Sequence, residues 1–363
     1  MTETTHPRYF AASNSCKGFC NYYGEIFAEP RVDRLYIIKG GPGTGKSHFM
    51  KTVARRARHY GYSVTEYACS SDPASLDGIL MTRESSPAIG ILDGTAPHVC
   101  EPTLPGVKEE IINLGTFWDS RLLVGQSDLI RALTAGKAAA YQRAYAYLSA
   151  CGDVNRAASS LMADCIRTDR MESLADRILR HRPRGEVFTP TPALRRAVGM
   201  TGQVCLHTFE QLAAEAGGTV LITEDYYGLG FCLTRALFEQ SRRACHELLV
   251  SYDPIYLDQI DGLYYPSDGL CILVGHAEPG EGTAVRTISL RRYANAEILR
   301  EIRGELRHAY ALRDRLTESA LHELASAAAC HFDLESVYSA AMDFPQKEAF
   351  TENFCKTLFS EKE

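Results

Sequence analysis

One segment constrains the fold of this chain more than any other: the glycine-rich stretch at residues 40–47. It reads Gly-Gly-Pro-Gly-Thr-Gly-Lys-Ser and fits the pattern G-x-x-x-x-G-K-[ST] in full. The apolar run at residues 35–38 precedes it directly, and residues 48–58 have the composition of a helix with a basic C-terminal end. A buried strand, a glycine-rich loop and a helix in this order predict an α/β fold with parallel strands covered by helices.

Each residue type in this loop has a physical reason to bind phosphate. Glycines let several backbone N–H groups point at one anion, and the following helix presents its positive N-terminal end. Lys46 adds a mobile charge for the β- and γ-phosphates, and Ser47 offers a hydroxyl ligand to Mg²⁺. We therefore expect ATP and Mg²⁺ to be bound by Gly40, Gly41, Pro42, Gly43, Thr44, Gly45, Lys46 and Ser47. The GTPase motif Asn-Lys-x-Asp is absent, which favours ATP over GTP.

Asp93 ends a further apolar run, residues 88–92, and is the second candidate for the site. An acid at this place is predicted to hold the metal with Ser47; the alternative is a turn or capping residue. Thr95 is a candidate to bond the γ-phosphate or the attacking water. His98 is a candidate to carry a proton, and a purely structural role for it is equally open. With Lys46, these three residues form the predicted catalytic set.

The residue after Asp93 is Gly94, where many ATP hydrolases keep a glutamate as general base. No arginine finger is evident in the sequence either. Hydrolysis would therefore be slow, or it would need a group from another segment to orient the water.

The second half of the chain repeats parts of the first. Six residues of the stretch 70–79 reappear 181 positions later, and the strand before Asp93 continues the match without a gap. Upstream, a shift of 185 places Gly43 and Gly45 on Gly228 and Gly230. The repetition indicates an internal duplication.

The second copy lacks the groups that nucleotide chemistry needs. The aligned pairs are Lys46 with Phe231, Ser47 with Cys232, Asp93 with Val274, Gly40 with Asp225, Thr95 with His276 and His98 with Pro279. We therefore expect a degenerate second half. Asp72, Pro73 and Asp77 recur in both halves and are expected to be turn and capping residues rather than catalytic ones.

The predicted fold is thus α/β, with two P-loop NTPase-like parallel-sheet halves that each carry a helical appendage. The appendages are expected at residues 127–180 and 305–360, where apolar residues recur at helical spacing. The predicted boundaries are residues 1–182 for the active half, 183–195 for a proline-rich linker and 196–363 for the degenerate half.

Charge and hydropathy narrow the class of partner. A net charge of −6 makes nucleic acid an unlikely general partner, since such binders usually carry a basic face. No apolar run approaches the roughly 18 residues that span a bilayer, and the first ten residues lack a signal-peptide core. We therefore expect a cytoplasmic protein without a membrane partner.

Several segments resemble an uncharacterised family of duplicated bacterial P-loop ATPases, found mainly in spore-forming Gram-positive bacteria. They are residues 10–19, 39–47, 70–73 with 76–78, 92–98 and 111–115, of which Asp-Gly-Thr-Ala-Pro-His at 93–98 is the most specific. The resemblance covers essentially the whole chain and implies ATP binding. In that family the second half often keeps its own phosphate loop, whereas residues 226–232 here read Tyr-Tyr-Gly-Leu-Gly-Phe-Cys. This departure argues against a two-site mechanism.

The leading functional hypothesis is an ATPase or ATP-operated switch that acts on an unknown protein partner. Two alternatives stay open. One is a phosphotransferase that passes the γ-phosphate to a small-molecule acceptor. The other is a nucleotide-binding interaction module without turnover.

Overall fold

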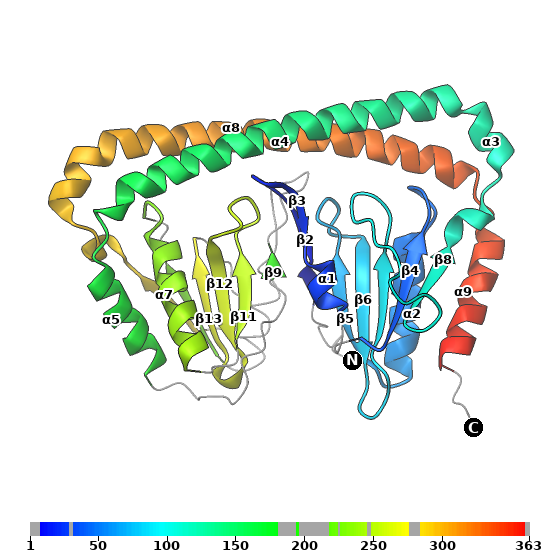
Figure 1. Cartoon of the computed structure of the whole chain (residues 1–363), viewed down its shortest axis with the longest axis horizontal. Coiled ribbons are helices and arrows are strands. Elements are labelled where there is room, and N and C mark those ends of the chain that lie inside the picture. The colour runs from blue at the N-terminus through cyan, green and yellow to red at the C-terminus, as the bar shows by residue number, and fades with distance from the viewer. Residues whose placement is uncertain are drawn as a thin grey trace. The chain divides into compact units, whose positions relative to one another are not determined.

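The computed structural model describes residues 8–28, 32–180, 194–195, 218–223, 226–244, 248–275 and 284–359 (Figure 1). The chain forms two compact units. The first unit comprises Met1–Ala12, Asn21–Arg143 and His322–Glu363, and the second comprises Ser13–Cys20 and Ala144–Leu321. None of the helices in the described ranges is both long and apolar enough to span a bilayer.

The first unit contains a six-stranded sheet with the order β1-β5-β6-β7-β4-β8. All neighbouring strands are parallel except β6, which runs antiparallel to β5 and β7. Helix α2 (Lys46–His59) follows β4 and buries its apolar face, which includes Phe49, Met50 and Val53. The strands are β1 (Arg8–Phe10), β4 (Arg34–Lys39), β5 (Ser63–Ala68), β6 (Leu76–Thr82), β7 (Ile89–Asp93) and β8 (Glu109–Asn113).

The second unit contains a sheet with the corresponding order β14-β10-β13-β12-β11-β9. Again one strand, β12, runs antiparallel to both neighbours while the other pairs are parallel. Helix α7 (Leu229–Arg243) follows β10 as α2 follows β4. The strands are β9 (Leu194–Arg195), β10 (Thr219–Thr223), β11 (Leu249–Tyr252), β12 (Ile260–Tyr265), β13 (Leu270–Val274) and β14 (Ala284–Ile288). The protein is therefore a mixed α/β protein with two sheets of the same strand order.

The strand registers correct the expected alignment of the two halves. Gly78 of β6 lies opposite Leu92, and Gly262 of β12 lies opposite Leu273. The two leucines are 181 positions apart, as expected, but the two glycines are 184 apart. The shift of 181 is therefore wrong for the stretch 70–79, because the turn between β12 and β13 is shorter than the turn between β6 and β7.

Two of the aligned pairs that change concern residues singled out in the sequence. Asp77 corresponds to Asp261, the residue before Gly262, and not to Asp258. Helix α7 begins after Gly228, which has the same left-handed conformation as the glycine before α2. Leu229 rather than Phe231 therefore takes the position of Lys46 at the start of the helix. Neither residue is basic.

Each long helix leads from the unit that contains the preceding sheet into the other unit. Helix α4 (Ser127–Ala163) leads to α5 (Thr168–Leu179), which packs against α7 in the second unit. Helix α8 (Ala296–Ala340) leads to α9 (Phe344–Phe359), which packs against α2 in the first unit. The predicted helical appendages exist, but each one covers the other sheet's helix, so the units do not follow the predicted boundaries at 182 and 196.

The remaining elements are short. They are β2 (Ala12–Ser15), β3 (Gly18–Asn21), α1 (Tyr23–Ile26), α3 (Ser120–Gly125) and the 3₁₀ helices Leu114–Phe117, Pro266–Asp268 and Arg291–Tyr293. The predicted linker lies outside the described residues except for β9, as do Asp225, His276 and Pro279.

Candidate functional site

The loop at residues 40–45 connects β4 to α2 and has a backbone that only glycine adopts readily. Gly43 and Gly45 have left-handed φ angles of 70° and 77°. A side chain on Gly43 would also collide with the backbone oxygen of Glu335. Helix α2 begins directly after Gly45. The predicted strand, loop and helix are thus present, with the loop at the N-terminal end of the helix.

Lys46 lies folded back over its own loop. Its Nζ donates to the carbonyl oxygens of Gly40 at 3.3 Å and Gly41 at 2.9 Å. It also lies 3.5 Å from Oδ2 of Asp93, and its side chain is only 14% exposed. Two neutral carbonyl oxygens and one carboxylate therefore hold the ammonium group at the loop. The ammonium group could leave the two carbonyl oxygens and bind an anion in the loop.

Asp93 lies beside the loop because of strand order. Strand β7 pairs in parallel with β4, with Asp93 opposite Ile38, so both strands end at the same edge of the sheet. Oδ1 of Asp93 accepts bonds from the amide of Thr95 at 2.9 Å and its hydroxyl at 2.6 Å, and the carboxyl group is buried. The hydroxyl of Thr95 thus points at Asp93 and fixes the orientation of its carboxylate.

Ser47 and Asp93 fit the chemistry that Mg²⁺ prefers. Oγ of Ser47 accepts a bond from the amide of Leu76 at 3.0 Å, which leaves a second lone pair of the hydroxyl. Oδ2 of Asp93 is an oxygen donor close to Lys46. A hydroxyl and a carboxylate beside a phosphate loop would suffice, because Mg²⁺ usually takes one or two protein ligands and completes its shell with phosphate and water.

His98 is held near Asp93 by a lysine and an acid. Nζ of Lys39, at the end of β4, donates to the carbonyl oxygens of Gly94 at 3.0 Å and Cys100 at 2.8 Å, which fixes the segment that carries His98. Nε2 of His98 lies 3.3 Å from Oδ2 of Asp77, on β6. Burial lowers the pKa of His98, but the hydrogen bond and charge of Asp77 outweigh it, so the net pKa is raised.

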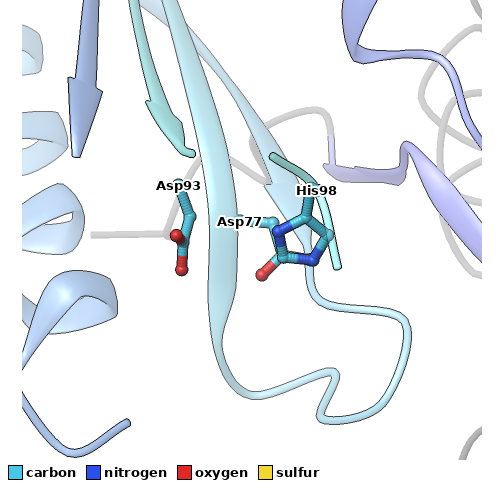
Figure 2. A group of neighbouring side chains, drawn as sticks. All are labelled: Asp77, Asp93 and His98. Carbon is cyan, nitrogen blue, oxygen red and sulfur yellow. The ribbon is translucent and has the colours of Figure 1, made fainter. Parts of the chain in front are cut away.

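The prediction that Asp77 is a turn or capping residue is wrong, because Asp77 lies within strand β6 and is a candidate for the site. It is 4% exposed, accepts a bond from the hydroxyl of Tyr23 at 3.0 Å, and faces His98 (Figure 2). One ligand atom each from Asp77, Asp93 and His98 all lie within 4.8 Å of one another, an arrangement that could hold a cation or pass a proton. The available signal was an Asp inside an apolar strand, where an unpaired carboxylate is costly. Its apparent recurrence as Asp258, at the shift of 181, hid that signal. Its structural counterpart, Asp261, is also buried, at 1% exposed.

Asp72 behaves as the sequence predicts. Its carboxylate accepts bonds from the amide of Ala74 at 3.1 Å and the hydroxyl of Ser75 at 2.7 Å. It therefore caps a turn, which confirms the prediction for this residue.

Residues of the C-terminal helices also contact the loop. No spacing of residues in the sequence predicts these contacts. Side chains on Gly41 and Gly45 would meet Tyr338 and Lys347, respectively, and Oγ of Ser339 donates to the carbonyl of Gly43 at 3.0 Å. Lys347 is fully buried and bonds to Glu348 at 2.9 Å. These residues follow the loop by roughly 300 positions, so only the return of α8 and α9 brings them to it.

The second unit has a different chemistry at the corresponding places. Val274 takes the position of Asp93, and Leu229 takes that of Lys46. An open pocket of about 1180 Å³ lies nearby, with Gly228 and residues of α5 and α7 in its wall. The pocket is in the unit without the loop lysine, so it is distinct from the candidate site.

No family model, curated protein or solved structure matches this chain. No relative therefore supplies a function for these residues.

Proposed function

We propose that the first unit binds ATP with Mg²⁺ and that the protein is an ATPase or ATP-operated switch. One observation carries the proposal. A left-handed glycine loop at a helix N-terminus holds a lysine 3.5 Å from a buried aspartate at the end of the adjacent parallel strand. Loop amides, helix end and lysine together form an anion site, and the aspartate supplies a cation ligand beside it.

The roles of the residues follow from their contacts. The loop amides and Lys46 bind the β- and γ-phosphates, with Lys46 leaving the carbonyl oxygens of Gly40 and Gly41. Ser47 and Asp93 hold Mg²⁺, which when bound neutralises charge on the phosphates. The matching strand orders support descent of both halves from one P-loop unit, the second of which has lost its phosphate-binding groups.

Loss of the Asp93 charge tests this arrangement. Asp93→Asn should lower ADP release from Mg²⁺-ATP by about 100-fold, because removing one preorganised electrostatic group commonly costs this much. ATP binding without Mg²⁺ should persist. Asp72→Asn, which removes an equal charge at a turn of the same unit, should release ADP like the wild type. Equal turnover in Asp93→Asn and the wild type would contradict the proposed metal site.

We assign the water-orienting role to His98, with Asp77 holding its ring. Both residues lie near Asp93. They take the role of orienting the water that many ATP hydrolases give to a glutamate at the position of Gly94. Asp77→Asn should lower single-turnover ADP formation by about 10- to 100-fold, in the range of general acid–base contributions, and leave the Kd for ATP within about twofold. Tyr23→Phe, which removes one bond to Asp77, should have a smaller effect. Unchanged turnover in Asp77→Asn would remove this pair from the mechanism.

The same assay separates the two alternatives. ADP release that depends on an added small-molecule acceptor would identify a phosphotransferase. Tight ATP binding without release would identify a binding module. Release stimulated by a protein partner, without a phosphorylated product, is the result expected of the switch.

A further inference from the structure

Lys347, in the first turn of α9, is a fully buried lysine that lies beside the phosphate loop. A Cβ atom on Gly45 would be 3.3 Å from its Nζ and 3.4 Å from its Cε. Gly45 is the last glycine of the loop, and helix α2 begins directly after it. The ammonium group of Lys347 is therefore held at the end of the loop where α2 starts.

The position of Lys347 is fixed by bonds within the first unit. The amide of Asp343 donates to the carbonyl oxygen of Phe117 at 2.7 Å, which anchors the start of α9. Oδ1 of Asp343 accepts the amide of Gln346 at 2.9 Å and caps the helix. Lys347 thus extends from an anchored and capped helix end.

The hydrogen-bonding capacity of this ammonium group is only partly used. Among the described residues, Nζ bonds to Oε1 of Glu348 at 2.9 Å and to Nδ1 of His48 at 3.2 Å. Glu348 is 43% exposed and His48 is 60% exposed, so water screens the carboxylate. An ammonium group has three N–H donors, and its burial is costly unless acceptors satisfy it. A buried lysine with two acceptors for three donors can bond to an additional anion.

Lys347 is close enough to the loop to share an anion with it. By standard backbone geometry the Gly45 nitrogen lies about 2.5 Å from the Cβ position, so Nζ is at most about 5.8 Å from this nitrogen. An oxygen that accepts bonds of about 2.9 Å from two nitrogens can join nitrogens up to about 5.8 Å apart. A phosphate bound at the amide of Gly45 is therefore within reach of Lys347.

The loop thus has one lysine at each end. Nζ of Lys46 lies at the carbonyl oxygens of Gly40 and Gly41, where the loop begins. Nζ of Lys347 lies at Gly45, where the first amides of α2 have no partner within the helix. Two ammonium groups at opposite ends of one loop suit an extended chain of phosphates better than a single anion.

We propose that Lys347 is a second lysine of the nucleotide site and binds the α- and β-phosphates at the start of α2. This inference rests on the proposed function and adds a binding residue to that site. Lys46 and Asp93 lie where the γ-phosphate and Mg²⁺ are expected, so Lys347 meets the other end of the phosphate chain. Both ATP and ADP carry an α- and a β-phosphate, and Lys347 therefore binds substrate and product alike.

Three variants of the full chain test this assignment. Lys347→Met removes the ammonium group and keeps an unbranched apolar side chain that fills the buried space. Glu348→Gln removes the exposed carboxylate that competes for the ammonium group. Lys356→Met is the control, because it removes an equal charge at an exposed position of the same helix. Calorimetry with Mg²⁺-ATP and with Mg²⁺-ADP measures each Kd, and chemical denaturation measures the free energy of unfolding.

Lys347→Met should weaken the binding of ATP and of ADP alike by about tenfold or more, because each nucleotide loses a charged hydrogen bond. The free energy of unfolding should change little, since water can hydrate the exposed carboxylate of Glu348 when its partner is gone. Glu348→Gln should tighten both Kd values by about two- to fivefold. Lys356→Met should leave both within about twofold of the wild type.

Two Kd values for Lys347→Met that stay within about twofold of the wild type overturn the inference. So does a loss for ATP with none for ADP, or an equal loss in Lys356→Met. If Lys347→Met does not fold, Glu348→Gln decides, and an unchanged or weaker Kd overturns the inference. If ATP binds and depends on Lys46 but not on Lys347, only this inference fails. If the wild type binds neither nucleotide, the proposed function fails with it.

Discussion

Replacing Lys46 by alanine is expected to weaken Mg²⁺-ATP binding by about 100-fold. Charged hydrogen bonds contribute about 1.5–3 kcal/mol each, and Lys46 is placed to make such bonds to phosphate. The substitution also leaves the buried carboxylate of Asp93 without its nearest cation, 3.5 Å away. Calorimetric titration of the wild type and the variant with Mg²⁺-ATP measures the change in Kd.

Lys51→Ala is the matched control for this experiment. Lys51 lies on the same helix, is exposed, and donates to the carbonyl of Ala74 at 2.6 Å rather than to a carbonyl of the loop. Its loss removes the same charge and should leave the Kd within about twofold, as for an exposed charge screened by solvent. ATP binding that survives Lys46→Ala undiminished would refute the proposed phosphate site.

Ending the chain after Asp343 is expected to lower the free energy of unfolding of the first unit by about 5 kcal/mol or more. The truncation removes α9, whose Phe354 ring lies 5.2 Å from Phe49 and whose Phe359 ring lies 5.3 Å from Tyr60. Burial of one phenylalanine side chain contributes about 1.5–3 kcal/mol, and α9 brings three phenylalanines to this core. Chemical denaturation followed by circular dichroism measures the loss.

A chain that ends after Phe359 is the control, since it keeps α9 and lacks only residues 360–363. It should unfold like the full-length protein. The shorter chain should also lose ATP binding, because Lys347 packs beside Gly45 of the loop. Unfolding of the shorter chain at the same denaturant concentration as the full chain would show that α9 adds nothing to the first unit.

The two experiments test different parts of the candidate site. The loop and its lysine are local, whereas the surface that covers them comes from the C-terminal helices. Binding of ATP by the first unit should therefore depend on residues beyond the second sheet in the sequence. Such a dependence favours a switch, in which nucleotide binding and the packing of the C-terminal helices are coupled, over two independent nucleotide-binding halves.

Local features were accessible from the sequence because their causes are local. Glycines at 43 and 45 permit the left-handed backbone, an apolar run before them forms β4, and the helix follows at once. The end of β7 at Asp93 follows from its own apolar run in the same way. In these elements the conformational preference of each residue agrees with the preferences of its immediate neighbours. They could therefore be predicted without knowledge of any distant contact.

Distant relations were decided by tertiary packing. The side chains of Asp77 and His98 meet because β6 is inserted antiparallel beside β7 and because Lys39 holds the following segment. Helices α5 and α9 could each have covered the helix of their own half, since an amphipathic face specifies that it must be buried but not against which partner. The paths of α4 and α8 determine which helix α5 and α9 each cover. The path of α8 also brings the backbone of Glu335 against Gly43. This contact exists only in the folded chain and cannot be predicted from any spacing along the sequence.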